Sequence, residues 1–163
     1  MLRRINIRQV VTIGDYPTAD VDHGAFLEYK KKVNKEINKP MLERVFPPGT
    51  IIRNVLTEKH EGNLTYGRQL GSYPILIGIP GKQELNKFID VKIIDHGYRS
   101  ITGLPWPYNL KEASPEELTF IPGIGKKRAN KIFFEKPETA KELRDLLGDD
   151  VPAGWFFEEN QIL

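Results

Sequence analysis

Residues 118–132 read Leu-Thr-Phe-Ile-Pro-Gly-Ile-Gly-Lys-Lys-Arg-Ala-Asn-Lys-Ile, and they carry the clearest structural signal in the chain. The Pro122-Gly123 pair ends a helix, because proline has no amide hydrogen and glycine adopts backbone conformations that other residues avoid. A second helix is expected to begin near Gly125, with Ala129 and Ile132 on its buried face. The stretch therefore predicts two helices joined by a tight hairpin.

The predicted hairpin has the chemistry of an anion site. Its two glycines let the backbone approach a ligand, and the first amide N–H groups of a helix have no partner within it. A helix start also favours negative charge. The residues expected to form this site are Gly123, Ile124, Gly125, Lys126, Lys127, Arg128 and Lys131.

Charge is concentrated around this hairpin. Residues 104–163 hold eleven Asp and Glu against eight Lys and Arg, yet residues 118–136 within them hold five Lys and Arg against Glu135 alone. A local basic island attracts phosphate more effectively than a diffuse excess, because such attraction decays within a Debye length. A solvated helix face would show the same lysines.

The stretch resembles the helix-hairpin-helix family, in which two glycines form the turn and small or apolar residues pack the second helix. The resemblance implies contact with phosphates of a nucleic-acid backbone, dependent on salt and little on base sequence. Some members of this family only pack against neighbouring elements or bind proteins, so a structural hairpin is the alternative.

Further helices are predicted on both sides of the hairpin. Residues 114–117, Ser-Pro-Glu-Glu, form a complete helix start with a hydroxyl cap, a first-turn proline and a capping glutamate. Pro137 opens another helix that carries Leu143, Leu146 and Leu147, and residues 155–157 are expected to pack on a core. These elements define a helical domain over residues 104–163.

The first 46 residues predict a strand and an amphipathic helix. Residues 4–10 alternate with period two, and residues 14–17 break that pattern. Asp22 can cap a helix whose apolar residues recur at helical spacing and which ends before Pro40. The Lys30-Lys31-Lys32 cluster is interpreted as a solvated face of that helix.

The middle of the chain, residues 47–103, predicts a small β-barrel. Residues 46–49, Phe-Pro-Pro-Gly, separate it from the helix before it. Short β-type runs follow at residues 50–56, 64–69, 75–79, 88–94 and 98–102, divided by glycines that suit tight corners. The expected fold class is α+β, with a TRAM- or OB-like antiparallel barrel and a helical domain.

The middle segment resembles a TRAM domain in its number of strands, its glycine spacing and its Tyr66-Gly67-Arg68 sequence. TRAM domains are small barrels found on RNA-modifying enzymes. The resemblance implies that exposed side chains could stack on bases and contact phosphates, the candidates being Arg53, Tyr66, Arg68, Tyr98 and Arg99. The alternative is that the tyrosines fill the barrel.

The order of strand, helix, barrel and hairpin resembles the C-terminal end of archaeal radical SAM iron–sulfur proteins. That resemblance implies an upstream catalytic domain with a 4Fe-4S cluster and S-adenosylmethionine. The sequence has no cysteine, so the cluster motif of that family is absent and no catalytic residue can be carried over. We therefore expect no cofactor and no enzymatic site within these residues.

Composition agrees with a folded cytoplasmic protein that does not enter the membrane. Hydrophobic residues make up 39% and charged residues 28%, and no apolar run approaches the roughly 20 residues that span a bilayer. The histidines, His23, His60 and His96, lack the spacing of metal ligands.

Three classes of function follow. The first is binding of RNA, with tRNA as the leading partner, on behalf of the upstream domain. The second is a DNA-binding helix-hairpin-helix module of a repair or recombination protein. The third is a protein-interaction or structural appendage, which predicts no salt-dependent binding to nucleic acid.

Overall fold

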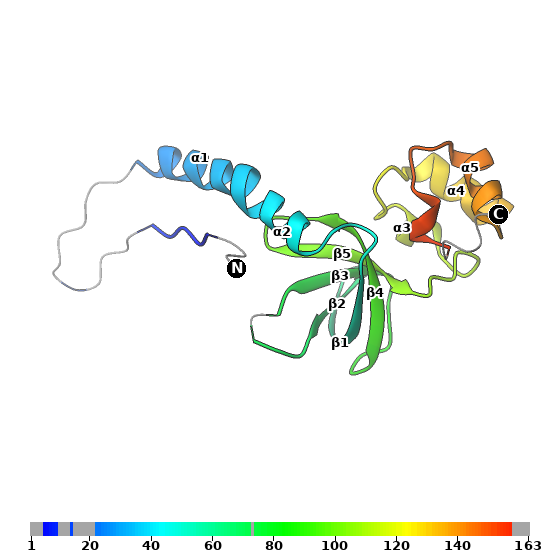
Figure 1. Ribbon diagram of the computed structural model, residues 1–163, viewed down its shortest axis with the longest axis horizontal. Coiled ribbons are helices and arrows are strands. Elements are labelled where there is room, and N and C mark those ends of the chain that lie inside the picture. The colour runs from blue at the N-terminus through cyan, green and yellow to red at the C-terminus, as the bar shows by residue number, and fades with distance from the viewer. Residues whose placement is uncertain (1–4, 10–13, 15–21, 73, 158–163) are drawn as a thin grey trace.

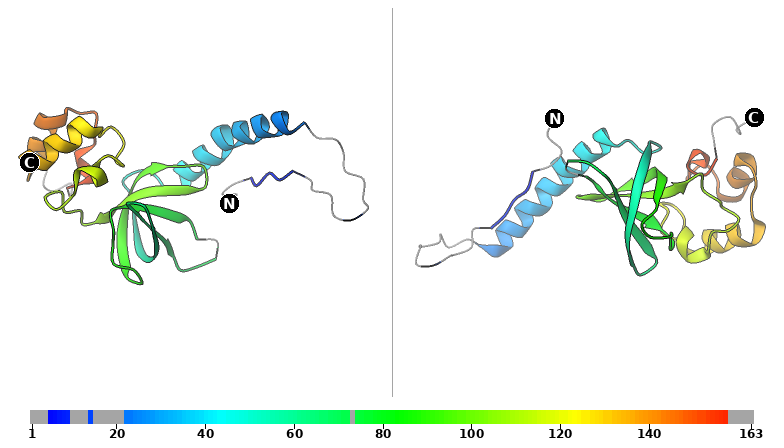
Figure 2. Two further views of the ribbon diagram at one scale, coloured as in Figure 1. Left: turned by 180° about the vertical axis from the view of Figure 1, so that it is seen from behind. Right: turned by 90° about the horizontal axis from the view of Figure 1, so that it is seen from below.

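The computed structural model describes residues 5–9, 14, 22–72 and 74–157. It shows three parts in chain order: a helical arm, a β-barrel and a small helical domain (Figure 1). The arm and the helical domain leave the barrel on opposite sides, and Figure 2 shows the same arrangement from two further directions. The barrel is therefore the centre of the molecule.

The helical arm is longer than the sequence predicts. It consists of α1 (His23–Val33), the π-helical turn η1 (Asn34–Asn38) and α2 (Lys39–Val45). Asp22 caps α1 as expected, by accepting hydrogen bonds from the Gly24 and Ala25 amides. The prediction that the helix ends before Pro40 is wrong, because the amide of Lys39 bonds to the Asn34 carbonyl five residues back. This wider turn lets the helix continue although Pro40 has no amide hydrogen to donate.

The predicted strand over residues 4–10 is also wrong for residues 5–9, which form no β-ladder. They run beside the arm instead, where Asn38 accepts a bond from the Ile5 amide at 2.7 Å and donates one to the Ile5 carbonyl at 3.0 Å. The Asn38 side-chain amide thus bonds to both backbone groups of Ile5, as a neighbouring strand would have done. Of the predicted break at residues 14–17, only Gly14 lies within the described residues, and its φ is +70°.

The middle segment is a closed five-stranded barrel, which confirms the predicted architecture. Its strands follow the order β1-β2-β3-β5-β4. Four ladders are antiparallel as expected, and the fifth, between the third and fifth strands, is parallel. The strands are β1 (Ile51–Glu61), β2 (Leu64–Gln69), β3 (Leu76–Pro80), β4 (Phe88–His96) and β5 (Ser100–Trp106).

The helical domain has its own core beside the barrel. It comprises α3 (Pro115–Leu118), α4 (Lys126–Glu135), α5 (Ala140–Leu147) and the 3-10 turn η2 (Ala153–Trp155). The capping box predicted at Ser114 and Glu117 is present. Phe156 is 4% exposed within the core, so the expected packing of this tail segment is confirmed there. The fold class is α+β, with a barrel and a helix-hairpin-helix domain.

Barrel and helical domain share hydrophobic contacts. Val91, Ile93 and Ile101 point into the barrel, whereas Ile94 and Leu104 on the same two strands belong to the core of the helical domain. Strand β5 continues to Trp106, past residue 103 where the barrel was predicted to end. The two parts therefore meet across a buried surface.

Gly103 lies at a crowded position of the barrel wall. A Cβ atom at this position would sit 2.3 Å from Cγ1 of Val91 and 2.9 Å from the Lys92 carbonyl oxygen. We expect Gly103→Ala to lower the free energy of unfolding by about 1–3 kcal/mol, the usual cost of overpacking a core. Gly154→Ala is the matched control, because its Cβ would meet open space. Urea denaturation of both variants measures this, and equal stabilities would contradict the packing.

Tyr108 lies just beyond β5 and packs against Phe156, with ring centroids 6.0 Å apart. Burial, and secondly the negative charge of Glu117, raise the pKa of its hydroxyl well above the ordinary value for tyrosine. The folded state therefore holds this proton more tightly than the unfolded chain does.

This difference predicts a loss of stability in alkali. As pH rises above about 10, the unfolded chain releases the Tyr108 proton first, so the free energy of unfolding falls by up to about 1.4 kcal/mol per pH unit. Tyr108→Phe keeps the ring and removes the proton. Denaturation at about pH 9 and about pH 11 should show a smaller loss in the variant than in the natural chain. Equal losses would mean that this hydroxyl is not linked to folding.

Candidate nucleic-acid interface

The hairpin between α3 and α4 is held from both sides by buried isoleucines. Ile121 and Ile124 are 2% and 3% exposed, and the Ile124 amide donates to the Ile121 carbonyl at 3.0 Å. Gly123 has a φ of +82°, and a Cβ there would lie 3.1 Å from Cγ2 of Val151. Glycine is required at this position by its backbone conformation as well as by the close neighbour.

The start of α4 is open to solvent. Its first carbonyl, that of Gly125, accepts from the Ala129 amide, and within the described residues no side chain caps this helix end. A Cβ at Gly125 would meet nothing within 4 Å. Lys126 and Lys127 are exposed beside it. Together these groups present outward-facing N–H donors and two cations.

Two of the predicted phosphate ligands are engaged in holding the domain together. The Arg128 guanidinium donates to the Gly123 carbonyl at 2.8 Å and pairs with Asp150 at 2.7 Å. The Lys131 ammonium donates to the Leu146 carbonyl at 3.2 Å, at the end of α5. Ile124 contributes packing because its side chain is buried.

The basic island of the sequence is therefore divided in space. Lys126 and Lys127 stand at one end of α4, whereas Lys136 follows the other end. A helix of 10 residues separates the two ends by about 15 Å. Because Arg128 is paired with Asp150, the cations at the hairpin that have no acidic partner among the described residues are Lys126 and Lys127.

The contacts of Arg128 predict that this residue supports the hairpin. We expect Arg128→Gln to lower the free energy of unfolding by about 1 kcal/mol, since one bond to a backbone carbonyl and one partly exposed ion pair are lost. Thermal or urea unfolding measures the change. A variant as stable as the natural chain would mean that Arg128 is not needed to support the hairpin and is available to bind phosphate.

Tyr66 lies on the outer face of the barrel and does not fill its interior. Its ring covers Gly78 on the neighbouring strand, where a Cβ would be 3.6 Å from Tyr66 Cε1. The Lys59 ammonium lies 5.3 Å from the ring centroid. A half-exposed aromatic ring beside a lysine can stack on a base. Lys59 was not predicted, because a bulge between Thr57 and Lys59 sets its pairing with Tyr66.

The two arginines predicted on β1 and β2 are both paired with carboxylates. Arg53 lies 3.0 Å from Asp90, and Arg68 lies 3.7 Å from Glu58. Both side chains remain exposed, Arg53 by 73%. A paired arginine offers less net attraction to phosphate than a free one.

Tyr98 and Arg99 lie together in the turn between β4 and β5, which the Gly97 amide closes by donating to Ser100. Tyr98 is 42% exposed and Arg99 is also exposed. This turn faces the helical arm, and Arg99 lines a pocket there. The predicted site residues thus divide among the hairpin, strands β1 and β2, and this turn.

The histidines have structural partners. His96 is 5% exposed, and its Nε2 lies 2.6 Å from the Phe46 carbonyl, which ties the end of α2 to the barrel. His60 contacts the Gln83 carbonyl and His23 contacts Gln9. Within the described residues, no group of three or more His, Asp or Glu side chains is arranged to hold a metal ion.

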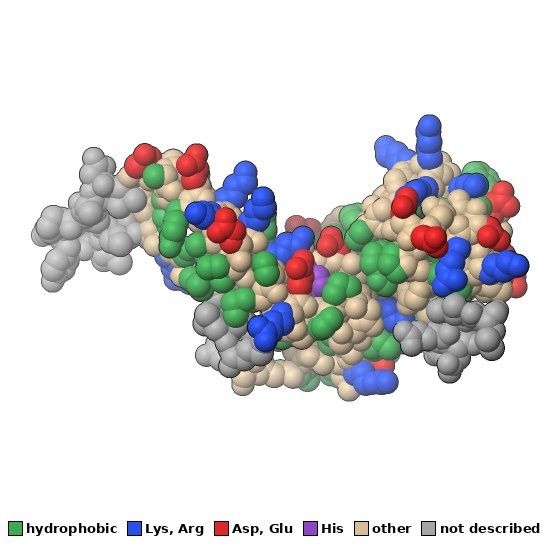
Figure 3. All heavy atoms as spheres, turned by 45° about the horizontal axis from the view of Figure 1, so that its top comes forward, with side chains coloured by type: hydrophobic (Ala, Val, Ile, Leu, Met, Phe, Trp, Pro, Cys, Tyr) green, Lys and Arg blue, Asp and Glu red, His purple; other side chains and the backbone are tan. Residues whose placement is uncertain are grey.

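None of the helices in the described parts of the chain combines the length and the apolar character needed to cross a bilayer. Figure 3 shows Lys and Arg side chains projecting from the helical domain and from the arm, with Asp and Glu between them. The charged surface is therefore mixed, and the basic positions are local.

Comparison with known proteins adds the family of the hairpin. Residues 109–133 match the family model described as the helix-hairpin-helix motif. The matched range contains α3, the hairpin and most of α4. This motif supports nucleic-acid binding in general.

Two archaeal relatives extend the similarity beyond the motif. An uncharacterized protein of Methanocaldococcus jannaschii is 48% identical over 112 residues, which are 63% of this chain and 21% of that protein. An uncharacterized protein of Archaeoglobus fulgidus is 33% identical over 144 residues, which are 84% of this chain and 26% of that protein. The aligned part of this chain thus spans only about a fifth to a quarter of each relative.

Proposed function

We propose that this chain is a nucleic-acid-binding accessory region that contacts the phosphate backbone through its helix-hairpin-helix. The observation that carries the proposal is the open start of α4, where uncapped amides and the exposed Lys126 and Lys127 stand together. Phosphate oxygens satisfy amide donors and cations at the same time. Binding of this kind depends on salt and discriminates little between base sequences.

RNA is the partner that the barrel favours, with tRNA as the first candidate. Tyr66 offers a partly exposed ring for stacking beside Lys59, and stacking on aromatic side chains is the usual way in which unpaired RNA bases are bound. A TRAM-like role for the barrel is part of this proposal. Duplex DNA is the second candidate, because the hairpin alone is equally suited to it.

The chain would serve a larger protein. Support comes from the relatives, of which the aligned residues form 21% and 26%. We propose a radical SAM enzyme as that protein, with its 4Fe-4S cluster and S-adenosylmethionine in an upstream catalytic domain. The present chain has no cysteine and so offers no thiolate ligand for a cluster, and we assign it no catalytic step.

The proposal predicts a specific effect of charge reversal at the hairpin. Lys126→Glu/Lys127→Glu should weaken binding of labelled tRNA at least about tenfold at low salt and make the slope of log K against log salt shallower by about 2. Fluorescence anisotropy over a salt series measures both quantities. The matched control is Lys136→Glu/Lys141→Glu, which changes the net charge equally at exposed positions away from the hairpin.

The same titration with duplex DNA separates the candidate partners. Tighter binding of tRNA than of duplex DNA, lost in the hairpin variant and kept in the control, is the expected result. Preference for duplex DNA would replace RNA by DNA as the partner. If the chain binds neither tRNA nor duplex DNA at low salt, the proposed nucleic-acid function is wrong. The chain would then be a docking or structural appendage.

A further inference from the structure

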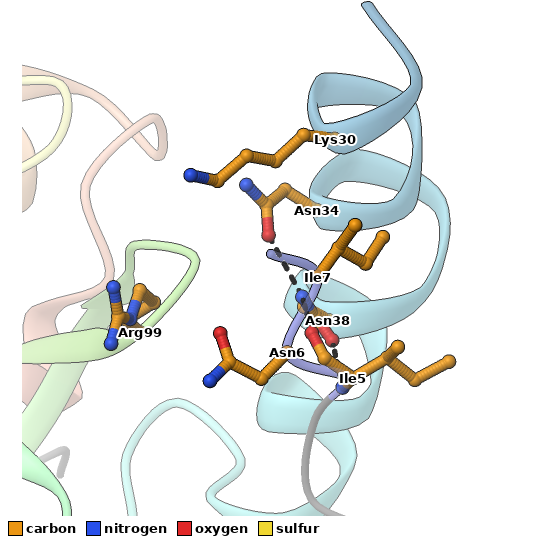
Figure 4. A pocket seen from close by; sticks show the side chains of 7 residues that line it. All are labelled: Ile5, Asn6, Ile7, Lys30, Asn34, Asn38 and Arg99. Atoms are coloured by element: carbon orange, nitrogen blue, oxygen red, sulfur yellow. Dashed lines mark hydrogen bonds between the residues drawn. The ribbon is translucent and has the colours of Figure 1, made fainter. Parts of the chain in front are cut away.

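A small pocket lies between the helical arm and the turn that joins β4 to β5. It is lined by Ile5, Asn6, Ile7, Lys30, Asn34, Asn38 and Arg99. Figure 4 shows the side chains of Lys30, Asn34 and Asn6 extending from the arm side toward the space in front of Arg99. Side chains from three separate segments therefore meet at one place.

The arm side of this pocket is held in shape by Asn38. This residue is 2% exposed and holds the Ile5 backbone by two hydrogen bonds. It also donates to the Asn34 side-chain oxygen at 2.8 Å. Because that oxygen is occupied, the Asn34 amide group turns its N–H donors toward the pocket (Figure 4). The π-helical turn places both asparagines on this side, and such turns are frequent at functional sites.

The described residues that line the pocket include two cations and no carboxylate. Within the described part of the chain, neither Lys30 nor Arg99 has an acidic partner at ion-pair distance, in contrast to Arg53, Arg68 and Arg128. The Lys30 ammonium lies 5.8 Å from the Phe26 ring centroid, a distant contact. An ammonium, a guanidinium and amide N–H groups are all donors, so their ligand must be an anion with several acceptor oxygens.

We propose that this pocket binds a phosphate group of the nucleic acid, as a second contact distant from the hairpin. The inference rests on the proposed function, because it takes RNA as the source of the phosphate. The arm and the hairpin lie on opposite sides of the barrel (Figure 1), so one RNA that reaches both must pass along the barrel. Free phosphate has the same chemistry and is the other source to be tested.

The test compares two double substitutions that remove equal charge. Lys30→Ala/Arg99→Ala empties the pocket of its cations, whereas Lys31→Ala/Lys32→Ala removes two exposed neighbours that do not line it. With labelled tRNA, the pocket variant should lose about tenfold in affinity at low salt, and its salt slope should be shallower by about 2. The control should keep the slope of the natural chain.

Several outcomes would overturn the inference. Equal slopes in the two double variants would show that only general charge matters at the arm. If the hairpin variant loses tRNA while the pocket variant keeps it, the proposed function stands and the pocket is not a phosphate site for RNA. If the natural chain binds no tRNA, the proposed function and this inference both fail.

Inorganic phosphate provides a readout that does not depend on RNA. In a proton–nitrogen NMR spectrum of the full chain, added phosphate should shift the signals of the Asn34 side-chain amide. In the Lys30→Ala/Arg99→Ala variant, the same signals should not shift. Shifts with inorganic phosphate but no effect of the pocket variant on tRNA would reassign the pocket to free phosphate. No shift at Asn34 would contradict a preformed anion site.

Discussion

Strands β4 and β5 pack on both of their faces, and the arrangement of the molecule depends on this. One face contributes Val91, Ile93 and Ile101 to the barrel, and the other contributes Ile94 and Leu104 to the helical domain. The Lys92 ammonium reinforces the joint by donating to the Gly154 carbonyl at 2.7 Å and by lying 3.2 Å from the centroid of the Trp106 ring. Buried apolar contacts between domains restrict relative motion, so the hairpin is held at a defined position on the barrel.

A fixed hairpin changes what the basic residues can do. Arg128 and Lys131 bond to backbone carbonyls of the helical domain, so among the described residues the proposed phosphate contact falls to Lys126 and Lys127. On the other side of the barrel, Arg99 and Lys30 lie without acidic partners among the described residues. Tyr66 lies on the outer face of β2, over Gly78 and beside Lys59. We infer that affinity comes from separated local contacts, in agreement with the small net charge of +2.

Local sequence signals predicted local structure well. Ser114 with Glu117, Asp22, and the Pro122-Gly123 pair each fix a turn through chemistry that lies within a few residues, and the structure has these turns in place. The number of barrel strands also followed from period-two runs and glycines. The continuation of the arm through Pro40 did not, because a π-helical turn has no signature in the pattern of apolar residues.

Contacts between distant segments could not be predicted in the same way. Residues 5–9 alternate like a strand but bond to the Asn38 side chain 33 residues away from Ile5. The Lys30-Lys31-Lys32 cluster looks uniform in sequence, yet only Lys30 lines the pocket with Arg99.

The central claim remains that the open start of α4 is the primary phosphate contact. An amide NMR titration of the full chain with a short RNA hairpin tests it most directly. The backbone amides of Gly125, Lys126 and Lys127 should shift most within the helical domain, and an undisturbed α4 start in the presence of bound RNA would contradict the account.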